Sequence, residues 1–200
     1  MQPAVRSAAV LVALTGLNLL AQRSRLDPDV VVPLGAVAAL TGARASGLSW
    51  DELGLGRQTL ARSLPAALGA GVLTGATITA AAALPGAHAY RIDSRYPDAS
   101  AARRAAFGTI PLSVVVPEEV LFRSVLDASL RRHLSDPQAA TVHAVAFGLW
   151  HALGATTLAD ENAGIRTMVG SGRSRAAVGV VGAVLATGLA GVGFGALRRR

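Results

Sequence analysis

Long apolar runs, each followed by a short polar break, constrain this chain more than any other feature. Six such runs occur, at residues 4–21, 30–43, 64–84, 105–130, 137–153 and 177–197. A run of about 20 apolar residues can cross a bilayer as a helix, because only a helix satisfies its own backbone hydrogen bonds there. We therefore expect an all-α fold: a polytopic transmembrane helical bundle of about six spans, integral to a membrane.

Composition and charge favour the same class of protein. Hydrophobic residues make up 52% of the chain and charged residues only 16%, whereas a soluble domain usually carries about 25% charged residues. The net charge is +7 and every basic residue is Arg, a balance that could suit a nucleic-acid-binding protein. The arginines instead fall in short groups between the apolar runs, as the flanks of membrane spans do. We expect the lipid bilayer as a partner and no nucleic acid.

The first run contains a single charge, Arg6, near its start. A signal peptide is one interpretation of such a run. The segment around Ala21 is a poor cleavage site and more apolar runs follow, so we favour a membrane anchor helix. We assign residues 1–46 to an amino-terminal two-span region and residues 47–200 to the core of the protein.

Residues 47–55 join the second run to the third. Ser49 and Glu52 have the spacing of a capping box, in which Ser49 is the N-cap and Glu52 the third helical residue. Trp50 is a residue type enriched at membrane interfaces. This pattern predicts a short interfacial helix.

Four ionisable residues lie inside the fourth run, which should otherwise be apolar. Glu118, Glu119, Arg123 and Asp127 fall within about 15 Å of helix. Such groups persist in membranes when they are paired, face water and carry function. Glu119, Arg123 and Asp127 follow at i, i+4 and i+8, so Arg123 can neutralise Glu119. Glu118 is turned about 100° away with no partner in its own helix, which leaves it available as a general base.

Pro117 precedes the two glutamates and frees a backbone carbonyl one turn earlier, which gives water room beside Glu118. If the span ended near Pro117, Glu118, Glu119 and Arg123 would form only a structural ion-pair cluster at a helix end. The apolar residues that continue after Arg123 weigh against this alternative.

The fifth run places His143, Phe147 and His151 on one helical face. The two histidines are about 12 Å apart along the axis, so they cannot share one metal ion. His151 is the better functional candidate because it lies at the end of the run, next to a polar loop. We interpret His143 as a packing residue.

Two motifs in these runs resemble those of one family. Residues 118–123 match EExxFR and residues 147–151 match FxxxH. This resembles the CPBP family, the CAAX-protease and bacteriocin-processing intramembrane endopeptidases, also called the Abi family. The resemblance implies a glutamate-dependent membrane peptidase of the bacterial cytoplasmic membrane that acts on a protein or peptide substrate, in one branch a lipidated one. No cofactor and no metal is expected.

The resemblance also implies roles for individual residues. Glu118 would be the general base that activates water, and His151 would bind and orient that water. Glu119 and Arg123 would hold the site together, and the motif phenylalanines Phe122 and Phe147 would support it.

The carboxyl end departs from the family pattern. The family has a further helix with His or Asn residues that support the oxyanion, but no histidine follows His151, and the interior of the sixth run offers only Thr187. We therefore expect that the core lacks the last helix.

Three alternatives to proteolysis by Glu118 remain. They are a non-catalytic membrane immunity or scaffold protein of the same fold, a zinc peptidase that uses Glu118, Glu119 and His151, and a proton-coupled transporter.

Overall fold

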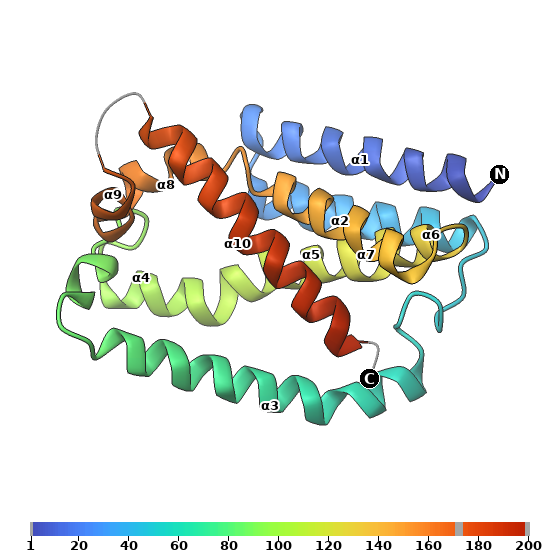
Figure 1. Cartoon of the computed structure of the whole chain (residues 1–200), viewed down its shortest axis with the longest axis horizontal. Helices are drawn as coiled ribbons and strands as arrows, with labels where there is room; N and C mark the ends of the chain where they lie inside the picture. The colour runs from blue at the N-terminus through green and yellow to red at the C-terminus, as the bar shows by residue number, and fades with distance from the viewer. Residues whose placement is uncertain (1, 171–173, 199–200) are drawn as a thin grey trace.

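The computed structural model describes residues 2–170 and 174–198, which form helices joined by turns (Figure 1). The elements in chain order are α1 (Pro3–Arg23), α2 (Pro28–Ala45), α3 (Arg57–Ala82), η1 (Ala87–Arg91), α4 (Ala99–Arg104), η2 (Ala105–Val115), α5 (Val116–Glu118), η3 (Glu119–Leu126), α6 (Asp127–Arg131), α7 (Asp136–Trp150), α8 (Ala155–Glu161), α9 (Ala163–Val169) and α10 (Arg175–Arg198). The expected all-α membrane bundle is confirmed.

Three helices in the described part of the chain are long and apolar enough to cross a membrane. They are Pro3–Arg23, the continuous helix Ala99–Arg131 and Arg175–Gly193. The second and fifth expected spans correspond to α2 and α7, of 18 and 15 residues. At 1.5 Å per residue these helices are about 27 and 22 Å long, shorter than a hydrocarbon core of about 30 Å. The third expected span lies in α3, where residues 71–81 form a shorter apolar stretch.

The helix Ala99–Arg131 is unbroken at Pro117, although its hydrogen bonding changes along its length. The segments η2 and η3 are π-helical, and the N–H of Val116 donates to the carbonyl of Pro111, five residues earlier. Proline has no N–H to donate, so Pro111 and Pro117 each remove one helical bond from this stretch. Glu118 therefore lies within a continuous helix and not at a helix end. π-helical turns are frequent at functional sites.

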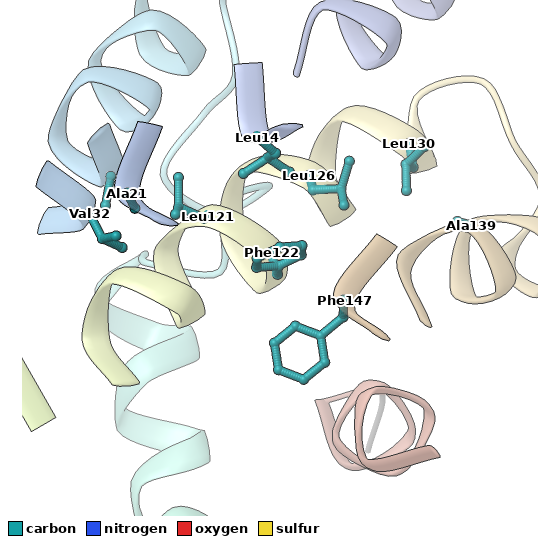
Figure 2. Packing of buried hydrophobic residues seen from close by; sticks show 10 residues of the cluster. Leu14, Ala21, Val32, Leu121, Phe122, Leu126, Leu130, Ala139 and Phe147 are labelled. Atoms are coloured by element: carbon teal, nitrogen blue, oxygen red, sulfur yellow. The ribbon is translucent and has the colours of Figure 1, made fainter. Parts of the chain in front are cut away.

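The segment η3 is the centre of the packing. On one side it contacts α1 and α2, which lie side by side, and on the other it contacts α7, which α10 crosses (Figure 1). Figure 2 shows Leu121 on the side of α1 and α2 and Phe122 on the side of α7. Both side chains are only 1% exposed. The helix α3 runs along the edge of the bundle and leaves most of its described side chains exposed.

The prediction of an interfacial helix over residues 47–55 is wrong, because this segment forms turns. Its capping box is made: the Ser49 N–H donates to Glu52 Oε2 at 2.7 Å, and the Glu52 N–H to Ser49 Oγ at 3.1 Å. These bonds close one turn only, since Gly54 then takes a left-handed conformation with φ of 70°. Leu48 and Leu53 are fully buried, so the segment is anchored in the core.

Candidate active site

Glu118 lies at the junction between α5 and η3 and is directed at the end of α7. Its Oε1 accepts a hydrogen bond of 2.8 Å from Nε1 of Trp150. The same oxygen is 3.8 Å from Nε2 of His151. The side chain of Glu118 is 15% exposed, so it is mostly, but not completely, removed from the surroundings. The carboxylate that lacks a partner in its own helix thus finds one on the neighbouring helix.

His151 follows the last residue of α7 and caps its carboxyl end. Its Nδ1 is 2.8 Å from the carbonyl oxygen of Phe147. A carbonyl only accepts hydrogen bonds, so Nδ1 of His151 carries a proton. In the neutral form of the ring, Nε2 is then the acceptor atom and presents its lone pair toward Glu118. A separation of 3.8 Å exceeds a direct hydrogen bond and is of the kind that a water molecule can bridge.

Glu119 and Arg123 form the ion pair expected from their spacing, with Arg123 Nη1 donating to Glu119 Oε1. The Arg123 side chain is 11% exposed and the Glu119 side chain 50% exposed. The guanidinium of Arg123 also lies 5.1 Å from the ring centre of Phe147, which connects η3 to α7. The ion pair lies within η3, and the contact of Arg123 with Phe147 links η3 to α7, the helix that ends at His151.

Aromatic rings fill the space between these polar groups. Phe122 meets the rings of Phe147 and Trp150 edge-on, with centroids 5.1 and 5.4 Å apart. Phe147 in turn meets the imidazole of His151 at 4.8 Å. Edge-to-face contacts of this kind fix ring orientation, so Phe122 and Phe147 set the positions of Trp150 and His151.

Asp127 lies on α6, and His143 lies on α7 about two helical turns before His151. Asp127 accepts a hydrogen bond of 2.7 Å from Nε of Arg131, a pairing that the expected ladder did not include. His143 is buried, with Nδ1 at 3.9 Å from Asp127 Oδ1 and with the rings of Phe122 and Phe147 as neighbours. Its burial among these rings is compatible with the packing role that we expected, which stays a prediction.

Two residues of the site were not recognised in the sequence. Trp150 is only an unspecified position within FxxxH, yet it supplies the hydrogen bond to Glu118. Asn18, on α1, donates from Nδ2 to the carbonyl of Trp150 at 2.9 Å and so fixes the end of α7. Both carried a signal, since an indole N–H and an amide inside apolar runs each need a partner.

Ionised groups outside the membrane spans reinforce the end of the bundle near residues 47–55. Hydrogen bonds from the backbone and side chain of Ser49, and then from Arg132, lower the pKa of Glu52 to about 2. Arg132 also donates to the carbonyl of Gly47 at 2.8 Å. These contacts tie the turn segment to the end of the helix that carries Glu118.

The described residues contain no group of three His, Cys, Asp or Glu side chains arranged to hold a metal ion. The zinc alternative needs such a set, because zinc sites in proteins use at least three protein ligands. Glu118 and His151 are two groups that could contribute to one.

Comparison with known proteins gives one finding on the family. Residues 102–200 match the family model described as Type II CAAX prenyl endopeptidase Rce1-like. The matched region includes Glu118, Glu119, Arg123 and His151. No curated protein and no solved structure matches the chain.

Proposed function

Residues 102–200 belong to the Rce1-like family of type II CAAX prenyl endopeptidases, and from this premise we propose that the chain is an intramembrane glutamic endopeptidase. The family supports a membrane protease of the CAAX type. The observation that carries the finer proposal is the approach of Glu118 and His151 from two helices, with Glu118 Oε1 and His151 Nε2 3.8 Å apart.

Glu118 acts as the general base in this proposal. It takes a proton from a water molecule as the water oxygen bonds to the carbonyl carbon of the scissile peptide. When the C–N bond breaks, the protonated Glu118 returns that proton to the leaving amine. The indole N–H of Trp150 holds the carboxylate in position through its hydrogen bond to Oε1.

His151 orients the water in this proposal. Its Nδ1–H is engaged by the carbonyl of Phe147, so Nε2 can accept a hydrogen bond from the water. Glu119 and Arg123 act through geometry: their ion pair and the contact of Arg123 with Phe147 keep the two helices in register. Phe122 and Phe147 support the same arrangement.

The substrates we propose are membrane-associated proteins or peptides, including those with a lipidated cysteine before a carboxyl-terminal tripeptide. The family description supports the prenyl class.

We assign residues 1–46 to an amino-terminal two-span region and residues 47–200 to the protease core, in the bacterial cytoplasmic membrane. Fractionation against inner-membrane markers checks that location.

The test is cleavage of a farnesylated reporter peptide by the purified chain in lipid nanodiscs. Glu118→Gln preserves size and removes the base, so the rate should fall by about 10²–10⁴. Glu161→Gln makes the same chemical change on α8 and should leave the rate unchanged. Equal cleavage by wild type and Glu118→Gln, with both proteins folded by thermal melting, would contradict the proposal. A folded wild-type protein with no activity would favour the scaffold alternative.

A further inference from the structure

A groove lies between α1 and α2, and Leu121 lines it from η3, whereas the neighbouring Phe122 lies on the side of α7. Its volume is about 440 Å³, within the range of small-molecule sites, and its floor is formed by Leu121, Val125 and Ser129. Apart from Arg6 and two serines, only apolar residues and glycines line it. From Arg6 to Leu17, its extent along α1 is about 16 Å, close to half of a hydrocarbon core of about 30 Å. The groove therefore has the length of one leaflet's acyl chain.

Arg6 closes one end of the groove and is its only charged group. The residue is 8% exposed, and its Nη2 donates to the carbonyl of Ser46 at 2.6 Å. Its Nε and Nη1 are also buried and have no hydrogen-bond partner among the described residues. A guanidinium cannot lose its charge in a protein, so these N–H groups call for an acceptor.

The surroundings of Arg6 favour an anion. Within the described ranges 2–170 and 174–198, no carboxylate forms an ion pair with Arg6. Arg44, two residues before Ser46 and in the last turn of α2, is a second cation, which donates to the carbonyl of Leu48 and lies over Trp50. Arg6 itself is in the first turn of α1, where the helix dipole also favours negative charge.

We propose that this groove binds an anionic phospholipid, with the phosphate at Arg6 and one acyl chain along the groove. Basic pockets between membrane helices bind anionic headgroups, and here the charged end and the apolar channel are continuous. The site is separate from the proteolytic residues and does not depend on the proposed function. A bound acyl chain would contact Leu121 and Val125 and so would stabilise η3 on the side of α1 and α2.

The chain supplies a matched pair of glycines for the test. A Cβ atom at Gly42, which lines the groove, would meet no atom within 4 Å, so Gly42→Leu adds bulk at the groove with no clash at Cβ. Gly16 on α1 has the same open surroundings but lies outside the groove, so Gly16→Leu is the control. Arg6→Leu removes the charge, and Arg6→Lys keeps it.

The experiment is native mass spectrometry of protein released from nanodiscs that hold equal amounts of phosphatidylglycerol and phosphatidylcholine. Wild type, Gly16→Leu and Arg6→Lys should retain phosphatidylglycerol in preference to phosphatidylcholine. Arg6→Leu should lower that retention about tenfold or more, since it removes a charge-assisted bond. Gly42→Leu should lower the retention of both lipids.

Three results would overturn the proposal. The first is equal retention of the two lipids by wild type. The second is binding of inorganic phosphate that depends on Arg6 while Gly42→Leu retains lipid like wild type. The third is a dimer that Gly42→Leu abolishes, which would assign the groove to a second copy of the chain. If Arg6→Leu fails to fold, the comparison of Gly42→Leu with Gly16→Leu still decides the result.

Discussion

The two faces of η3 differ in how completely they are filled. Toward α7, Phe122 is enclosed by aromatic rings, and the nearby charges of Glu118 and Arg123 have partners. Toward α1 and α2, Leu121 and Val125 form the floor of an apolar groove with a buried arginine at its end. Contacts within the chain fill the first face, whereas the second face borders a groove that the chain itself leaves open. The two faces therefore differ in whether the chain supplies the contacts that complete them.

A large effect should follow from breaking the ion pair on the filled face. Arg123→Leu leaves Glu119 without this partner and removes the contact with Phe147, so we expect about 3–5 kcal/mol less stability. Because the Glu119 side chain is 50% exposed, the lower end of that range is the more realistic value. The measurement is the free energy of unfolding in a dodecyl sulfate titration. An Arg123→Leu protein as stable and active as wild type would contradict the structural role that we propose for the Glu119–Arg123 pair.

A smaller effect is the expected difference in stability cost between truncating Phe122 and truncating its neighbour Leu121, which lie on different faces of η3. Phe122→Ala opens a cavity within a closed aromatic cluster and should cost about 3–5 kcal/mol. Leu121→Ala only enlarges a groove that detergent or lipid can enter, so we expect about 2 kcal/mol, the low end for such a change. Both are measured by the same titration. Equal costs would show that the groove face is packed as tightly as the other.

The smallest expected effect is a pH dependence of the protein's stability that arises from Glu52, in the turn segment 47–55. The pKa of Glu52 is lowered to about 2 in the folded protein, from an ordinary value of 4.5. A lowered carboxyl pKa stabilises the fold above pH 4.5, and this stabilisation is lost as pH falls from 4.5 toward 2. Glu52→Gln should flatten the thermal-stability profile in that window by a small amount, since the side chain is 40% exposed. An unchanged profile would show that Glu52 contributes nothing measurable.

The helices could be predicted from the sequence because an apolar run in a bilayer has few other structures open to it. The i, i+4 spacing likewise predicts the Glu119–Arg123 pair. The segment 47–55 was mispredicted because a capping box requires only one helical turn, and Gly54 ends that turn. Two short helices, α8 and α9, also occupy the stretch around residues 155–169, much of which we interpreted as a polar loop.

The contacts between helices could not be predicted in the same way. The partner of Glu118 is Trp150, which is 32 residues away, and helical spacing says nothing about such pairs. The support of Trp150 by Asn18 spans 132 residues. The groove depends on how α1 and α2 pack over η3, which no single apolar run specifies.

The central claim is that Glu118 and His151 act on one water molecule. The most direct test is a double-mutant cycle on peptide cleavage, with Glu118→Gln, His151→Ala and the combined variant. Residues that work as one unit lose their effect together, so the double variant should be about as slow as Glu118→Gln alone. Independent losses that multiply in the double variant, or cleavage by Glu118→Gln at the wild-type rate, would contradict the account.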